Sequence, residues 1–173
     1  MVSQIIGLMG VSEHRRAAVD VVRCAVVTVS DTRTEATDAS GRAIVDLLQD
    51  AGHVVESKSL VRDEPEQVRT IVGAHIGRLD AVITTGGTGI ASRDTTCDAL
   101  EALFQRRLDG FGELFRSLSY EEIGSAAMLS RATAGIAHGT VVFVLPGSEH
   151  AVRLAMTKLI LPELGHLIHE LRK

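Results

Sequence analysis

A glycine-rich stretch at residues 84–89 is the part of the sequence best suited to chemistry. It reads Thr-Thr-Gly-Gly-Thr-Gly, so Cβ atoms are missing where a chain must turn tightly or approach a ligand. Successive N–H groups of such a loop can hold a phosphate. No Gly-Lys-Ser/Thr follows, and Ser92 replaces a third glycine, which excludes the Walker A and G-x-G-x-x-G motifs. The residues Thr85, Gly86, Gly87, Thr88 and Gly89 therefore form either a phosphate-binding loop or a plain strand-to-helix turn.

Charged residues beside this loop indicate how an anionic ligand could be neutralised. Arg93 could clamp a phosphate, and Asp94 could hold Mg²⁺, whose protein sites typically combine carboxylates with substrate phosphates. Asp63, two residues before Pro65, offers a second carboxylate. Each aspartate is equally suited to be the N-cap of the helix that follows it. The two roles are compatible, because a capping carboxylate still presents an oxygen.

Two further polar segments follow buried strands. Ser30 and Asp31 come after one β-branched run, and Pro146-Gly147-Ser148 ends another. A helix that begins at Ser148 would present free N–H groups and the positive end of its dipole to an anion. Ser148 is therefore either a helix cap or a ligand contact, and the sequence favours neither.

The elements that must position these residues alternate between strands and helices. Apolar runs predict strands at residues 23–30, 53–61, 80–85 and 140–145. Helical spacing predicts helices around residues 44–51, 65–79, 95–104, 111–119, 149–160 and 163–171. Pro162 is expected to interrupt the chain between the last two. The type of secondary structure at residues 132–138 is ambiguous from sequence. This order predicts an α/β fold with a mainly parallel sheet covered on both faces. Ligands of such sheets bind beyond the carboxyl ends of the strands, where all these polar segments fall.

Length and composition limit the classes of function. The 173 residues predict one domain, which we assign to residues 21–173, after an N-terminal arm at residues 1–20 that would pack on a partner subunit. The net charge of −4 provides no global field for nucleic acid or an anionic membrane. The apolar run within the arm is too short to span a bilayer. We therefore expect neither a nucleic-acid nor a membrane partner.

The cysteines and histidines predict structural roles. Cys24 lies in an apolar run and is expected to be a small core residue, and Cys97 is expected in the first turn of a helix rather than as a nucleophile. Their spacing argues against a disulfide framework and favours a reducing cytosol. The seven histidines lack metal-ligand spacing, and no G-x-S-x-G sequence is present. Neither a zinc site nor a serine hydrolase is expected.

Motifs spread over nearly the whole chain give a more specific expectation. They are Thr-Val-Ser-Asp-Thr-Arg-Thr (28–34) with Asp38 and Gly41, Thr-Gly-Gly-Thr-Gly (85–89) with Arg93-Asp94, Gly-Phe-Gly-Glu-Leu-Phe-Arg (110–116), Glu-Glu-Ile-Gly-Ser (121–125), Leu-Ser-Arg-Ala (129–132), Pro-Gly-Ser (146–148) and Leu-Pro-Glu-Leu-Gly-His (161–166). Together they resemble the MoaB/MogA family of molybdenum cofactor biosynthesis proteins, and the MoaB type most closely. Arg62 and Cys97 stand where many relatives have proline.

The resemblance implies a three-layer α/β/α molybdopterin-binding fold and a trimer or dimer of trimers, in keeping with the cytoplasmic location that the cysteines favour. It also implies molybdopterin adenylyltransferase activity, in which the terminal phosphate of molybdopterin attacks the α-phosphorus of ATP and pyrophosphate leaves. A separate enzyme then inserts the metal. The family's two functional aspartates correspond to Asp63 and Asp94, which would hold Mg²⁺ between the substrates. The glycine loop and Arg93 would bind the phosphates, and Gly147 and Ser148 would hold the pterin end.

A function of a different class is also compatible with the resemblance. The MoaB type includes relatives that are not catalytic, so the resemblance also allows a molybdopterin carrier or an oligomeric scaffold of the same pathway. The presence of both Asp63 and Asp94 favours the enzyme. Glu149, next to Pro-Gly-Ser, would repel an anionic ligand if it pointed inward, so we expect it to point outward.

Overall fold

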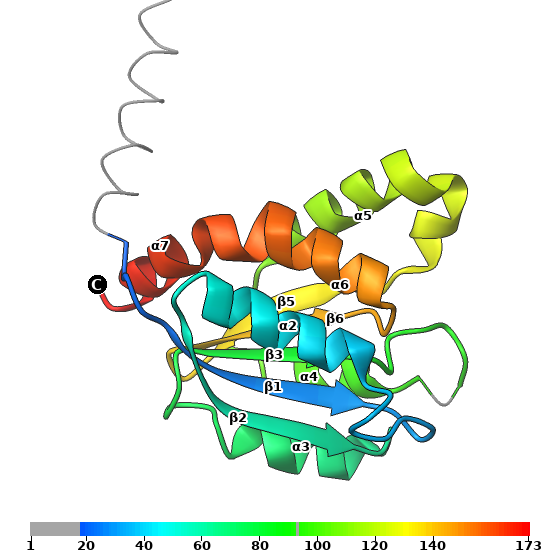
Figure 1. The fold of residues 1–173 in the computed structure, drawn as a ribbon, viewed down its shortest axis with the longest axis horizontal. Coiled ribbons are helices and arrows are strands. Elements are labelled where there is room, and N and C mark those ends of the chain that lie inside the picture. The colour runs from blue at the N-terminus through cyan, green and yellow to red at the C-terminus, as the bar shows by residue number, and fades with distance from the viewer. Residues whose placement is uncertain (1–17, 93) are drawn as a thin grey trace, which may run out of the picture.

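A mixed six-stranded sheet forms the centre of the molecule (Figure 1). The computed structural model describes residues 18–92 and 94–173. The strands are β1 (Arg23–Val29), β2 (Val54–Val61), β3 (Ala81–Thr85), β4 (Arg106–Arg107), β5 (Thr133–Ala137) and β6 (Thr140–Leu145), in the spatial order β2-β1-β3-β6-β5-β4. Neighbours among β2, β1, β3 and β6 are parallel, and β5 is antiparallel to both of its neighbours. The predicted mainly parallel sheet is confirmed.

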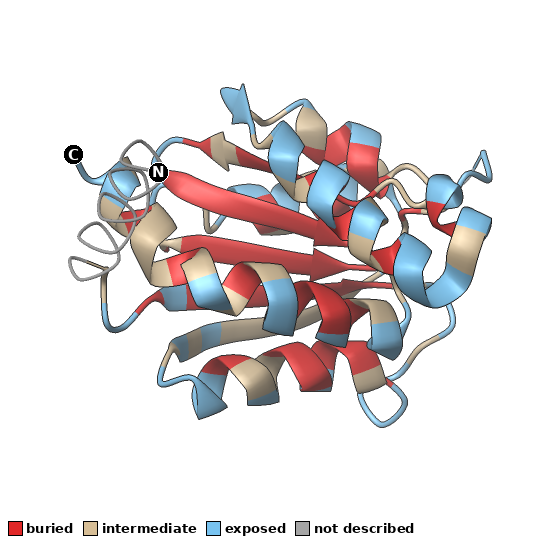
Figure 2. Ribbon diagram, turned by 90° about the horizontal axis from the view of Figure 1, so that it is seen from above, coloured by how far each residue is buried: buried red, intermediate tan, exposed pale blue. Residues whose placement is uncertain are grey.

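Helices cover both faces of this sheet, which gives the predicted three-layer α/β/α fold. One face carries α2 (Ala39–Asp50), α5 (Asp109–Ile123), α6 (Glu149–Ala155) and α7 (Leu161–Leu171), with a 3₁₀ segment at Gly124–Leu129 and a π-helical turn at Met156–Ile160. The other face carries α3 (Pro65–Gly73) and α4 (Thr96–Glu101). Figure 2 shows the buried strands enclosed between helices whose outer surfaces are exposed.

Successive residues of the central strands pack on opposite sides and build a core on each face. On β1, Cys24 and Val26 join the cluster beneath α2, α5 and α7, whereas Ala25 and Val27 join the cluster beneath α3 and α4. All four of these residues are fully buried. Because both faces are covered, the strand sequence is apolar at consecutive positions rather than at every second one. The same reason explains why the apolar runs predicted these strands well.

The sequence predicts that Pro162 separates two closing helices, and the structure shows that this prediction is wrong. The π-helical turn at Met156–Ile160 joins α6 directly to α7, and Pro162 lies at the first turn of α7. A π turn inserts one residue into the hydrogen-bond register, and proline is tolerated where its missing N–H is not required. The chain therefore passes this proline as one continuous helical run.

Other differences from the predicted elements are confined to short or late segments. The helix predicted at 95–104 covers only Thr96–Glu101, and the one predicted at 111–119 extends over Asp109–Ile123. Leu79 lies beyond the end of α3, although it is buried as expected. The ambiguous residues 132–138 contain β5, which pairs with β6 and with the two-residue strand β4. Two residues are too few to show a strand period in sequence.

The first described residues of the chain lie alongside α7. The Val19 N–H donates to the Gly165 carbonyl at 3.0 Å, and a Cβ on Gly165 would lie 2.4 Å from the Val19 carbonyl oxygen. Residues 1–17 of the predicted arm lie outside the described residues, so its packing on a partner stays a prediction. None of the described helices is long and apolar enough to cross a membrane.

Candidate functional site

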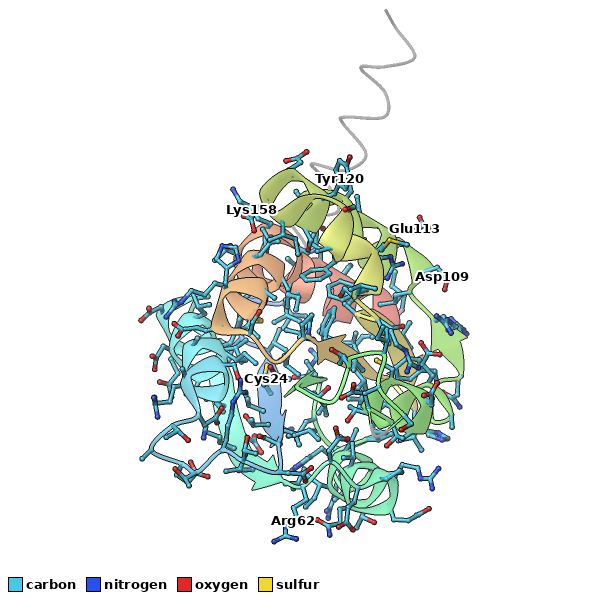
Figure 3. All side chains as sticks on the ribbon, turned by 90° about the vertical axis from the view of Figure 1, so that its right-hand side faces the viewer. Cys24, Arg62, Asp109, Glu113, Tyr120 and Lys158 are labelled. Atoms are coloured by element: carbon cyan, nitrogen blue, oxygen red, sulfur yellow. The ribbon has the colours of Figure 1, made fainter. Side chains whose placement is uncertain are left out.

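All four polar segments singled out in the sequence meet at one edge of the sheet. Residues 30–31 follow β1, Asp63 follows β2, residues 86–94 follow β3, and residues 146–148 follow β6. These four strands are parallel, so their carboxyl ends share this edge. Figure 3 looks onto that edge, and Arg62 points outward from its lower end. Arg62 is exposed, which explains why the sequence tolerates a residue other than proline there.

Gly86 and Gly87 shape the loop that follows β3. Both have a positive φ, +102° and +63°, a region that favours glycine. A Cβ on Gly86 would lie 2.1 Å from the Val29 carbonyl oxygen, and one on Gly87 would lie 2.1 Å from Thr96 Oγ1. The Gly86 N–H donates to the Leu145 carbonyl at 3.0 Å, which ties the loop to β6. Close contact with neighbouring groups therefore requires both glycines.

Three amides of the glycine loop are available to a ligand. Unlike the Gly86 N–H, the N–H groups of Gly87, Thr88 and Gly89 donate to no acceptor within residues 18–92 and 94–173. Thr85, by contrast, is buried and donates through Oγ1 to the Pro146 carbonyl at 2.8 Å. Thr85 thus supports the loop, whereas the next three amides could hold an anion.

Neither aspartate caps the helix that follows it. The N-cap of α3 is Glu64 and that of α4 is Thr95, and neither cap side chain accepts a hydrogen bond from its helix. Asp94 instead accepts the Ala91 N–H through Oδ2 at 2.9 Å, which closes the loop on itself. The alternative of two capping residues is therefore wrong for this structure.

Both carboxylates lie against the glycine loop. The Asp63 oxygens would be 2.8 and 2.9 Å from a Cβ on Gly87, and Asp94 Oδ2 would be 2.4 Å from a Cβ on Gly89. Thr96 donates to Asp63 Oδ1 at 3.2 Å, and the Asp63 N–H donates to Asp31 Oδ1 at 3.2 Å. Two carboxylates, one from the segment after β2 and one from the segment after β3, are thus brought to the loop whose amides are free within the described residues.

The donor set at this loop fits a magnesium ion bound with a phosphate ligand. Carboxylate oxygens are the protein ligands that Mg²⁺ uses, one or two at a time, with phosphate oxygens and water completing the shell. Within the described residues, no three acidic, His or Cys side chains cluster into a metal cage. A cation held by Asp63 and Asp94 would therefore take further ligands from the substrate. Arg93, predicted to clamp a phosphate, lies outside the described residues.

The Pro-Gly-Ser corner is held in place by Arg33, a residue that the sequence did not single out as part of the site. Arg33 donates to the Gly147 carbonyl at 2.5 Å and to Ser40 Oγ at 2.6 Å. Its own loop is shaped by Ser30, whose Oγ accepts the Arg33 N–H at 3.1 Å. Ser30 therefore acts on the local turn, and Arg33 links the loop after β1 to the corner after β6. Only the motif at residues 28–34 signalled this arginine in the sequence.

Ser148 caps α6. Its Oγ accepts the Ala151 N–H at 3.2 Å, which supports the cap alternative, while its hydroxyl hydrogen can still be donated to a ligand. Glu149 is exposed and forms an ion pair with Arg153 at 2.7 Å, four residues further along α6. The outward direction expected for Glu149 is confirmed. Its charge is thereby kept from the corner.

A cavity of about 430 Å³ lies between the glycine loop and α5. One side is formed by Gly86–Gly89, Asp94 and the Pro-Gly-Ser corner. The opposite wall is contributed by α5 and the 3₁₀ segment after it, with the side chains Phe115, Ser119, Ile123, Leu129 and Ser130. The sequence marked this wall only as family motifs, because nothing in helical periodicity shows which face of α5 borders a ligand cavity.

A buried carboxylate anchors the loop that carries Arg33. Asp38, the N-cap of α2, is fully buried and accepts from the Gly41 N–H and from Thr28 Oγ1, each at 2.9 Å. Lys58 Nζ lies 2.9 Å from the same carboxylate. Burial raises the pKa of Asp38, but the Lys58 ammonium and the hydrogen bonds from Gly41 and Thr28 outweigh it and leave the pKa lowered.

Lys58→Met is expected to lower the free energy of unfolding by about 2 kcal/mol at pH 7, because a buried carboxylate loses its charged partner. Because the pKa of Asp38 is lower in the folded than in the unfolded protein, its carboxylate stabilises the fold at pH values above the unfolded pKa of about 4. This stabilisation is lost as the pH falls through the folded-state pKa. The loss in the variant should therefore shrink below about pH 4. Urea unfolding at several pH values measures it. An equal loss at pH 7 and at pH 3 would contradict this account.

Both cysteines are buried, as expected for Cys24. Burial raises the pKa of each thiol to about 12, and the Cys97 Sγ donates to the Arg131 carbonyl at 3.2 Å. Cys97 lies in the first turn of α4, as predicted. Since the thiolate is the reactive form, neither residue is equipped to be a nucleophile.

Native protein is accordingly expected to leave both thiols unmodified by a maleimide reagent at pH 8 over an hour. Unfolding in guanidinium should make both react within minutes, because exposure returns each thiol to its ordinary pKa. Mass spectrometry counts the added groups in the two samples. Rapid labelling of Cys97 in the folded protein would show that the segment between α4 and β5 opens.

The fold and the site define an open α/β protein whose ligand cavity lies at the carboxyl ends of parallel strands. Residues 25–166 match the family described as "Probable molybdopterin binding domain". The chain is 52% identical over 168 residues to molybdenum cofactor biosynthesis protein B of Bacillus subtilis, covering 95% of this chain and 99% of that relative. These matches extend over both aspartates and the whole cavity.

Solved structures of related proteins also superpose closely on this chain. A crystal structure of a molybdenum cofactor biosynthesis protein B superposes with a TM-score of 0.85 at 54% identity, covering 90% of this chain and 98% of the other. The tungsten cofactor synthesizing protein MoaB of Pyrococcus furiosus superposes with a TM-score of 0.82 at 38% identity, covering 90% and 100%. The chain belongs to the molybdopterin-binding domain family and, within it, to the MoaB proteins.

Proposed function

We propose that the protein is a molybdopterin adenylyltransferase of molybdenum cofactor biosynthesis. In this reaction a phosphate oxygen of molybdopterin attacks the α-phosphorus of ATP, the bond to the β-phosphate breaks, and pyrophosphate leaves. The observation that carries the proposal is that Asp63 and Asp94 both lie against a glycine loop with free amides, and that neither is used as a helix cap. Family membership supports molybdopterin as the ligand.

The chain's own contribution to such a transfer is alignment and charge compensation. Phosphoryl and nucleotidyl transfers need substrates held in line and their negative charge neutralised, with little covalent help. The free amides of Gly87, Thr88 and Gly89 would orient a phosphate. Asp63 and Asp94 would hold Mg²⁺, which supplies positive charge to the phosphates when bound. Without that cation, two carboxylates beside a polyphosphate would repel it.

Incubation of the protein with molybdopterin, ATP and Mg²⁺ tests the proposal. Adenylyl-molybdopterin and pyrophosphate should form in equal amounts, detected by liquid chromatography with mass spectrometry. Omission of Mg²⁺ with excess chelator should stop their formation. Molybdopterin binding without either product would favour the second function considered, a carrier or scaffold.

The predicted partners follow from this reaction. We propose that ATP and molybdopterin are the substrates, that the product passes to a separate metal-inserting enzyme, and that the site of action is the cytosol. Two buried cysteines without a disulfide between them are compatible with a reducing compartment. The trimer or dimer of trimers stays a prediction, and light scattering on the purified protein measures it.

A further inference from the structure

The wall of the cavity that α5 forms has no role in the reaction proposed for the aspartates and the glycine loop. Phe115, Ser119 and Ile123 follow one another at intervals of four residues and therefore share one face of α5. All three line the cavity opposite the glycine loop and the Pro-Gly-Ser corner. In Figure 1, α5 stands beside the edge at which the parallel strands end. The wall is thus placed to meet a molecule whose phosphate lies on the loop.

Two hydroxyls that line this cavity are not used by the described part of the protein. Ser119 is 5% exposed and Thr88 is 6% exposed, and both line the cavity. Neither hydroxyl has a hydrogen-bond partner in the part of the chain that the structure describes. Among residues 18–92 and 94–173, Thr95 Oγ1 is the one fully buried side-chain oxygen without a partner, so the Ser119 and Thr88 oxygens remain accessible at the cavity. Accessible hydroxyls that no protein group uses are available to orient a ligand.

Apart from Ser130, whose Oγ accepts the Ala132 N–H at 3.4 Å, the rest of the wall is apolar. Phe115 is buried at the base, whereas Ile123 and Leu129 are 56% and 51% exposed at the rim. Pockets for small molecules typically combine such apolar surface with a few polar groups that orient the ligand. Aliphatic and aromatic side chains around the Ser119 hydroxyl suit a flat ring that carries hydrogen-bonding nitrogens at its edge. They do not suit a phosphate, because none of the described residues that line this wall is basic.

We propose that Ser119 binds the heterocyclic end of the phosphate-bearing substrate, with the ring enclosed between the α5 wall and the Pro-Gly-Ser corner. The inference rests on the proposed function, which puts the phosphate on the glycine loop. Both substrates share the required chemistry, since each joins a flat nitrogen heterocycle, pterin or adenine, to a phosphate. The Ser119 hydroxyl would hydrogen-bond to a ring nitrogen or an exocyclic group, and Ile123 and Leu129 would cover the ring face. This gives the motif around α5 a role in ligand binding.

Ser119→Ala tests the proposal by equilibrium binding of molybdopterin, ATP and pyrophosphate in separate titrations. We expect a rise of about fivefold in the dissociation constant of the substrate whose ring lies on this wall, as for the loss of one hydrogen bond. Pyrophosphate, which has no ring, should bind as it does to the wild type. Ser117→Ala, an exposed position two residues earlier on α5, is the matched control and should change none of the three.

Two results would overturn the proposal. Unchanged binding of both molybdopterin and ATP by the folded variant would remove Ser119 from the pocket, and equal weakening of pyrophosphate would indicate a general disturbance. Urea unfolding of both variants confirms that they are folded. Because binding is measured without turnover, a wild type that binds its ligands but yields no product would contradict the adenylyltransferase proposal alone. The substrate whose dissociation constant rises, molybdopterin or ATP, is the one whose ring lies against the α5 wall.

Discussion

Asp94→Asn is expected to lower the formation of adenylyl-molybdopterin by about two to three orders of magnitude, with molybdopterin binding nearly unchanged. Asparagine has the same size and keeps an oxygen that can accept the Ala91 N–H, so the loop around Asp94 should persist. The neutral amide cannot compensate a divalent cation, so the charge on the phosphates would no longer be balanced. Steady-state rates and a separate binding titration measure the two quantities.

The control for this variant is Asp98→Asn. Asp98 lies four residues later, is 67% exposed, and pairs with Arg131 at 2.5 Å. The substitution Asp98→Asn removes the same charge from the same region without touching the glycine loop. Because exposed ion pairs contribute little, we expect turnover within about twofold of the wild type. Normal turnover by Asp94→Asn would exclude Asp94 from the reaction. Comparable losses in the two variants would indicate only a regional charge effect.

Gly86→Ala is expected to lower the free energy of unfolding by about 3 kcal/mol, the largest effect we expect at any glycine of the loop. The φ of +102° is strained for alanine, and the new Cβ would lie 2.1 Å from the Val29 carbonyl oxygen. That oxygen belongs to the end of β1, which is paired with β2 on one side and β3 on the other, so it can move little. Urea unfolding gives the free energy directly.

Gly73→Ala is the matched control for this substitution. Gly73 ends α3 in helical geometry, and a Cβ there meets no heavy atom within 4 Å. Alanine should stabilise the helix by up to about 1 kcal/mol. A Gly86→Ala protein as stable as the wild type would show that the loop can move away from β1, and the close packing we describe would then be wrong.

Local sequence predicted the edge of the sheet well because its signals are local. An apolar run followed by Gly86-Gly87 or by Pro146-Gly147 defines a buried strand and the turn that ends it, whatever the rest of the chain does. Parallel strands then bring those turns to one edge. Asp63, which follows β2, is predicted at this edge for the same reason.

Local sequence failed where distant segments determine the outcome. Arg33 reaches Gly147 across 114 residues, and no spacing rule relates them. The capping alternative for Asp94 was reasonable from sequence, yet the chain folds so that the carboxylate accepts from Ala91 instead of from α4. The continuity past Pro162 likewise depends on a π turn that no residue pattern announces.

The sequence by itself determined the α/β class, the family and the residues able to handle phosphate, because these depend on motifs and on strand and helix periods. Only the tertiary structure decided which groups are free to act. It uses the Gly86 amide and the Ser148 oxygen for structure. Within the described residues it leaves the next three loop amides and the Ser119 hydroxyl at the cavity without a partner. The physical reason is that hydrogen bonding and burial are properties of atoms in contact, and contacts between distant segments form only when the chain folds.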